Sequence, residues 1–208
     1  RAEKRAQRRE EKARLAKIKE REDAILAKEK ALKDNVINSL VKFVKIYHTK
    51  GAKKARVYLT EISEDDELKE WIDFDFQVTN AFDYLEMEED VFKILKTKKN
   101  SRFKTLLDGK SKTIQLLSVS ISGLYIRYKN GNSYKSQIVP LSAIPLSFAD
   151  AEILPQFDEE EQVFAGVYLY SQIGKQSAID KLIETQDEDE DNIMNLVFKK
   201  YAEEFTQE

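Results

Sequence analysis

The sequence has 208 residues, of which 41% are hydrophobic and 35% charged, and its formal net charge is −3. The hydrophobic content is enough for a core and excludes a fully disordered chain, while the near balance of charge argues against a uniformly basic nucleic-acid-binding protein. There is no cysteine, which excludes disulfide bonds, thiolate metal sites and cysteine nucleophiles.

The same features bear on location. No stretch approaches the roughly 20 consecutive apolar residues that a membrane-spanning helix needs, so we expect no membrane segment. The lack of cysteine fits a reducing compartment, and we expect a cytoplasmic protein or a component of a particle assembled inside the cell. The chain begins with Arg1 rather than Met, and we expect that residues precede it.

The first 34 residues predict one long charged helix. They contain neither Gly nor Pro, and residues with good or fair helix propensity dominate. Ile18, Ile25 and Leu32 recur every seven residues, but two glutamates interrupt the seam between them, so the pattern is a poor coiled-coil heptad. The apolar stripe widens after residue 34 and ends at Gly51, which predicts that this second part packs on a globular core.

Two segments that follow favour β-structure. Residues 55–62 are rich in β-forming types, and an acidic turn separates them from residues 71–78. The second segment has strictly alternating apolar residues: Ile72, Phe74, Phe76 and Val78. We therefore predict a β-hairpin with a long loop.

Residues 88–107 return to helical spacing and predict a helix across one face of the sheet, ended by Asp108-Gly109. The clearest β pattern follows between residues 113 and 141. Apolar-rich runs there surround Ser122-Gly123 and Asn130-Gly131, and the second dipeptide supplies the positive φ of a tight hairpin turn. We predict a meander of three antiparallel strands.

The last quarter of the chain is expected to be helical. Three prolines between residues 140 and 155 predict an irregular connector. Residues 163–173 are ambiguous, since Val, Phe and Tyr favour a strand while the preceding acidic run suits the start of a helix, and we favour the helix. Residues 177–184 and 192–205 have helical spacing and predict a helical pair.

Together these elements predict an α+β fold with a long charged N-terminal helix, a small, mainly antiparallel sheet with a crossing helix, and a C-terminal helical pair. We divide the chain into a helical arm (1–34), an α+β core (35–147) and a C-terminal helical region (148–208).

Two arrangements of residues raise the question of catalysis. His48 is the only histidine, and near a helix end an imidazole usually lies at the surface or caps the last carbonyls, so we do not expect it to be catalytic. Asp73 and Asp75 would share one face of a strand and, with Glu61, could hold a divalent cation for phosphodiester cleavage. The wet face of an antiparallel sheet explains these aspartates equally well, and we favour that interpretation.

The acidic run 187–191 imitates the start of a calcium loop. However, Asn192 stands where glycine is needed and Phe198 where a bidentate glutamate is needed, so we interpret the run as the acidic start of a helix. Neither a Walker loop nor a GxGxxG pattern occurs. We therefore predict no catalytic residue, no metal, no cofactor and no small-molecule substrate.

The remaining candidates are binding surfaces. The arm is net positive, and its best candidate contacts for phosphates or a partner are Arg5, Arg8, Arg9 and Lys12. Glutamates among these cations and the lack of an aromatic residue weaken a nucleic-acid interpretation of the arm and favour docking on protein. Tyr125 and Arg127 alternate away from two apolar neighbours on a predicted strand and could form a second contact surface.

From the sequence we expect a non-enzymatic structural or assembly subunit of a large complex such as a virion, which binds other protein subunits through its N-terminal helix. The alternative is an accessory nucleic-acid-binding protein that contacts phosphates through the basic arm. A metal-dependent nuclease is a third and less favoured interpretation.

Overall fold

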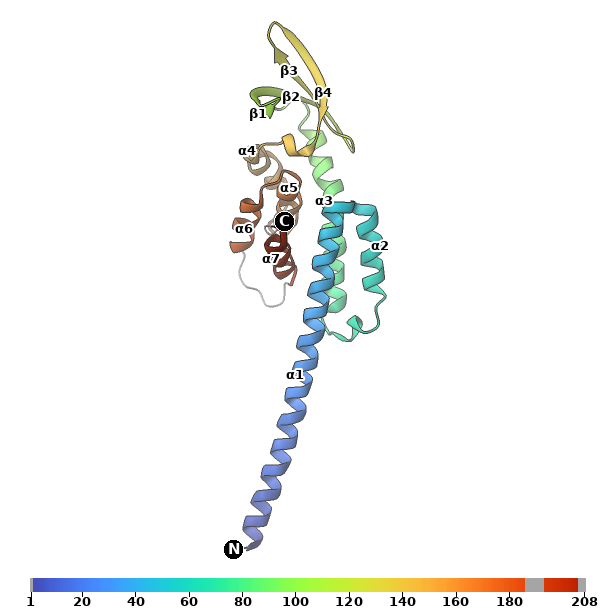
Figure 1. Ribbon diagram of the computed structural model, residues 1–208, viewed down its shortest axis with the longest axis vertical. Coiled ribbons are helices and arrows are strands. Elements are labelled where there is room, and N and C mark those ends of the chain that lie inside the picture. Colours follow the sequence, from blue (N-terminus) through green and yellow to red (C-terminus); the bar gives the residue numbers. More distant parts are fainter. Residues whose placement is uncertain (1, 186–192, 206–208) are drawn as a thin grey trace.

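The computed structural model describes residues 2–185 and 193–205, without the side chains of residues 2–10, 160 and 205. The helices are α1 (Ala2–Lys50), α2 (Ala52–Ser63), α3 (Phe74–Thr97), α4 (Leu146–Phe148), α5 (Glu159–Gln172), α6 (Gln176–Glu184) and α7 (Ile193–Phe205). The strands are β1 (Arg102–Leu107), β2 (Lys110–Ser120), β3 (Gly123–Asn130) and β4 (Ser133–Val139). The predicted α+β class is confirmed. Figure 1 shows an elongated molecule with the free end of α1 at one end, helices in the middle and the sheet at the other end.

The long N-terminal helix is confirmed and continues without a break through 49 residues. Described side chains from residue 11 to 31 are exposed, whereas Leu32 and most apolar residues after it are buried. Gly51 has φ 83, a conformation that glycine adopts at little cost, and it ends α1 as predicted. The following helix α2 packs back against α1.

The predicted β-hairpin over residues 55–78 is wrong, because this region forms α2 and the start of α3. In α2 the buried residues Ala55, Leu59 and Ile62 are spaced as on one face of a helix. Only the composition of this segment favoured a strand. In the second segment, Phe74 and Val78 are buried, and they lie four residues apart on one side of α3. Phe76 is 60% exposed on another side of α3, and Ile72 lies in the turn before the helix. The apparent period of two therefore does not reflect a strand.

The predicted helix over residues 88–107 is correct only as far as Thr97. Asn100 has φ 73 in the turn after α3, and Arg102–Leu107 form β1, the first strand of the sheet. Asp108-Gly109 adopt φ 53 and φ 72 and form the β1–β2 turn rather than the end of a helix. Phe103 and Leu107 are four residues apart, which mimics helical spacing, but both point inward from a strand.

The sheet is a four-stranded antiparallel meander in the order β1-β2-β3-β4, so the three predicted strands are confirmed and β1 is added. Four residues on its inner face, Ile114, Leu116, Leu124 and Ile126, are fully buried. This face packs on the end of α3 and on α4, where the rings of Phe103 and Phe148 lie 4.6 Å apart. The opposite face stays exposed.

The connection between the sheet and α5 consists of short helical turns: η2 (Leu141–Ala143), α4, η3 (Ala149–Ile153) and η4 (Leu154–Gln156). This confirms the irregular connector. The favoured helix over residues 163–173 is also confirmed as part of α5, whose N-cap Asp158 accepts a hydrogen bond from the Glu161 amide at 2.9 Å. Helices α6 and α7 follow where the sequence predicts them, although Asn192 lies outside the described residues.

Buried residues from Leu32 to Ala202 form one hydrophobic core. Its largest fully buried side chains include Phe43, Tyr84, Tyr168 and Phe198, which come from α1, α3, α5 and α7. The core therefore joins the last part of α1 to the helices of the C-terminal region. The division of the chain at residues 34 and 147 remains a prediction.

Candidate functional site

The projecting part of α1 carries large apolar side chains that no other described part of the chain covers. They are Leu15, Ile18, Ile25 and Leu26, and between 42% and 63% of each is exposed. Figure 1 shows this part of α1 extending away from every other helix and from the sheet. Isolated exposed apolar residues are common on proteins, but four along one uncovered helix form a candidate docking surface. We call these four residues the arm stripe.

Further exposed apolar residues follow the turn that contacts α1. Lys28 forms an ion pair with Glu70 at 2.6 Å, which brings the turn η1 (Leu68–Glu70) beside α1. Two residues later Ile72 is 92% exposed, and Phe76, one helical turn further along α3, is 60% exposed. Ile72 and Phe76 are therefore further exposed apolar residues, close in sequence to the turn that contacts α1.

The predicted arm contacts Arg5, Arg8 and Arg9 lie on α1, but their side chains are outside the described part of the structure. Lys12 lies on the same helix and is exposed. The structure does not bring these residues together with Tyr125 and Arg127, because the arm and the sheet lie at opposite ends of the molecule (Figure 1).

Tyr125 and Arg127 lie on the exposed face of β3, while Leu124 and Ile126 point into the core, as the alternation predicts. The guanidinium of Arg127 donates a hydrogen bond to Gln115 Oε1 at 2.8 Å and lies 5.6 Å from the ring centroid of Tyr134. The exposed fractions of the Tyr125 and Tyr134 side chains are 42% and 71%. These contacts hold the Arg127 guanidinium beside the exposed ring of Tyr134.

This exposed face, which we call the outer face, is strongly basic. Its residues, assigned from strand register and exposure, are Arg102, Lys104, Leu106, Thr113, Gln115, Ser118, Tyr125, Arg127, Lys129, Tyr134, Ser136 and Ile138. Among described residues, none pairs ionically with Arg102, Lys104, Arg127 or Lys129. Their charges are therefore available to a ligand.

From the sequence we identified only Tyr125 and Arg127 of this face, although the local charge of the segment indicates a basic surface. Residues 109–149 include neither Asp nor Glu, in a chain that is 35% charged overall. Between residues 102 and 139 there are seven lysines or arginines and one acid, Asp108. A local count of charge would have identified the segment, whereas the net charge of −3 conceals it.

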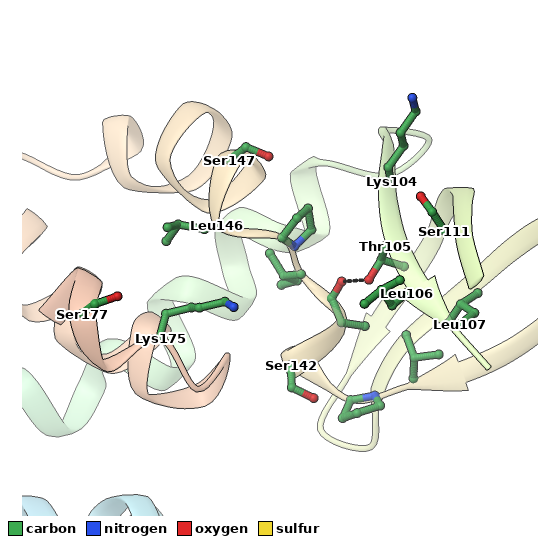
Figure 2. Close-up of a pocket in the computed structure, with 15 residues that line it drawn as sticks. Lys104, Thr105, Leu106, Leu107, Ser111, Ser142, Leu146, Ser147, Lys175 and Ser177 are labelled. Carbon is green, nitrogen blue, oxygen red and sulfur yellow. Dashed lines mark hydrogen bonds between the residues drawn. The ribbon is translucent and has the colours of Figure 1, made fainter. Parts of the chain in front are cut away.

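A groove of about 810 Å³ borders the outer face at its edge strand β1. Lys104 and Leu106 belong to both surfaces, and the opposite wall includes Lys175 and Ser177 at the start of α6. Figure 2 shows these walls on either side of the 140–147 connection, which the Thr105 hydroxyl anchors by donating to the Ala143 carbonyl at 2.6 Å. No carboxylate is among the described residues that line the groove, so its lysines and hydroxyls suit an anionic group.

The interpretation of His48 as a surface or capping residue is wrong. It lies in the last turn of α1, but its ring is within 6.2 Å, between centroids, of four tyrosine rings: Tyr47, Tyr84, Tyr168 and Tyr201. Its Nδ1 accepts from the Gln172 amide at 3.3 Å, which leaves Nε2 to donate to the Tyr84 hydroxyl at 2.7 Å. Burial lowers the pKa of His48 to about 4, so the imidazole is neutral at pH 7.

The proposed pairing of Asp73 and Asp75 on one strand face is also wrong. Asp73 is the N-cap of α3 and Asp75 lies in its first turn, where residues two apart point in different directions. Within residues 2–185 and 193–205, no cluster of three metal-ligating side chains could hold an ion. The acidic run 187–191 lies outside the described residues.

The fold and its surfaces define an α+β protein with a projecting helix and an open basic sheet. No family model, no curated protein and no solved structure matches this chain. Among the described helices, none combines the length and the apolar character needed to cross a membrane.

Proposed function

We propose that the protein is a non-enzymatic subunit of a large assembly that docks on a partner protein through the projecting part of α1. The observation that carries this proposal is the arm stripe, which lies on a helix that is anchored in the core at one end and uncovered at the other. A helix held in this way presents its side chains in a fixed arrangement before it meets a partner. That arrangement reduces the conformational entropy lost on docking.

The chemistry of the arm indicates the kind of partner. Full burial of an exposed Leu or Ile side chain contributes about 1.5–3 kcal/mol, and the four stripe residues, each 42–63% exposed, can each gain about half of that amount on docking. Amphipathic helices commonly bind by placing such a stripe in an apolar groove. The first 33 residues contain 13 lysines or arginines and seven acids, and we therefore expect a groove with an acidic rim.

The proposal predicts that Ile25→Gln with Leu26→Gln weakens partner binding at least tenfold, because two apolar contacts become buried amides without partners. The measurement is affinity purification of the full chain from its natural source after nuclease treatment, followed by titration of the partner that forms a stoichiometric complex. The free energy of unfolding should change by less than about 0.5 kcal/mol, since both side chains are exposed.

The matched control is Val57→Gln with Ile121→Gln, which removes two exposed apolar side chains away from the arm. It should leave binding unchanged. Lysine cross-linking gives a second readout, because Lys17, Lys19, Lys28 and Lys30 flank the arm stripe. A partner that is held equally by both double variants, or whose cross-links avoid these lysines, contradicts docking through the arm.

A further inference from the structure

We propose that the outer face of the sheet binds single-stranded nucleic acid, with Arg102, Lys104, Arg127 and Lys129 contacting phosphates and Tyr125 and Tyr134 stacking on bases. This surface is distinct from the arm stripe. It also differs from the basic arm, which is the nucleic-acid contact that the sequence pattern favours.

Charge complementarity selects an anionic ligand. The four cations project from β1 and β3, and the face of β2 between them contains uncharged polar groups such as Thr113 and Gln115. Arg102, Gln115, Arg127 and Ser136 are register partners in one row across the four strands. Adjacent strands are about 4.8 Å apart, so the two arginines of this row are spaced to contact different phosphates.

The aromatic residues indicate nucleic acid rather than an acidic protein. A base stacks on a tyrosine ring with little dependence on sequence, and alternating basic and aromatic residues are typical of surfaces that bind single strands. Tyr125 lies opposite Ile138 and Tyr134 lies opposite Lys129 in the β3–β4 pairing. The rings of Tyr125 and Tyr134 thus lie on either side of Arg127, and the Arg127 guanidinium contacts the Tyr134 ring.

The exposed rings also favour an unpaired strand over a duplex. Bases inside a duplex stack on one another and leave no face for Tyr125 or Tyr134, whereas the bases of a single strand are free to stack on protein. The basic surface continues over β1 to the groove of Figure 2, where Lys175 extends it. By contrast, the first 33 residues combine their cations with seven acids and have no aromatic residue.

The test is a titration of the full chain against fluorescently labelled single-stranded oligo-U and oligo-dT and a duplex of equal length, read by anisotropy over a range of salt concentrations. Saturable binding of either single strand, tighter than that of the duplex, is the expected result. Arg127→Gln with Lys129→Gln should weaken binding about tenfold or more and reduce the salt slope of log K by about 1.4, the amount expected for two lost phosphate contacts.

A second variant tests stacking separately from charge. Tyr125→Ala with Tyr134→Ala should weaken binding about tenfold or more while the salt slope remains unchanged, because no charge is lost. Circular dichroism should show a native spectrum for both variants, since all four side chains are exposed. The charge control is Lys53→Gln with Lys54→Gln on α2, which also removes two exposed cations and should leave binding within about twofold.

Three results would overturn the proposal. The first is an equal loss in the α2 control, which would show unspecific attraction. The second is a loss confined to a variant with Arg5, Arg8, Arg9 and Lys12 all replaced by Gln, which would assign binding to the arm. The third is tighter binding of a polyglutamate peptide than of oligonucleotide, with no effect of the tyrosine variant, which would assign the face to an acidic protein.

Discussion

Replacement of Gly123 with alanine is expected to lower the free energy of unfolding by about 4 kcal/mol. Gly123 begins β3 with φ 124, a conformation that residues with a side chain rarely adopt. A Cβ at this position would also lie 2.3 Å from the carbonyl oxygen of Val139 in β4. Because backbone cannot rotate away as a side chain can, the β3–β4 pairing would have to shift. Chemical denaturation of wild type and variant measures the difference.

Gly131→Ala separates the cost of the positive φ from the cost of the clash with β4. Gly131 lies in the β3–β4 turn with φ 63, and a Cβ there would have no other atom within 4 Å. This variant has the conformational cost without the clash and should lose only about 1–2 kcal/mol. Equal losses for the two variants would show that the close approach of Gly123 to β4 does not contribute.

The second large effect is a loss of stability at acid pH, which we expect from the protonation of His48. Burial lowers the folded-state pKa to about 4, while an unfolded histidine titrates near 6.5, so in this interval the unfolded chain binds more protons than the folded one. Stability is therefore fully present above about pH 6.5 and falls as the pH decreases towards 4. The total loss is about 3 kcal/mol, with a slope near 1.2 kcal/mol per pH unit around pH 5.5.

His48 is the only histidine in the chain, which makes the experiment direct. Denaturation of wild type between pH 7 and pH 5 should show the slope, and His48→Gln, which can still donate to the Tyr84 hydroxyl, should remove it. Glu88 opposes the effect at lower pH, because burial raises its pKa and protonation then favours the folded state. An imidazole NMR titration near pH 6.5 in the folded protein would contradict the prediction.

The sheet shows why some elements could be predicted from sequence and others could not. Asn130-Gly131 identifies a turn through two adjacent residues, and the alternation of Leu124 to Arg127 assigns a face to each side chain. Both patterns depend on neighbouring residues alone, so the structure confirms the turn and the two faces of β3. Residues 72–78 contain apolar residues at every second position, a spacing that also satisfies i and i+4 on a helix. Only the packing of Phe74 and Val78 into the core distinguishes the two.

The candidate binding surfaces were likewise predicted in part from the sequence and in part only from the structure. The sequence indicated the arm and identified Tyr125 and Arg127, but it did not connect them with Arg102, Lys104 or Tyr134. Those residues come from different strands, and β1 itself has a helical spacing of apolar residues. The register of the sheet brings them to one face.

The sequence by itself determined the long charged helix, its end at Gly51, the three-stranded meander and the helices of the C-terminal region. Each of these depends on helix propensity, turn residues or periodicity within a few consecutive positions. The tertiary structure alone decided that residues 55–78 form helices rather than a β-hairpin, that β1 joins the sheet, and that His48 lies among tyrosines. These outcomes depend on which distant residues bury each side chain, and neither propensity nor local spacing specifies those partners.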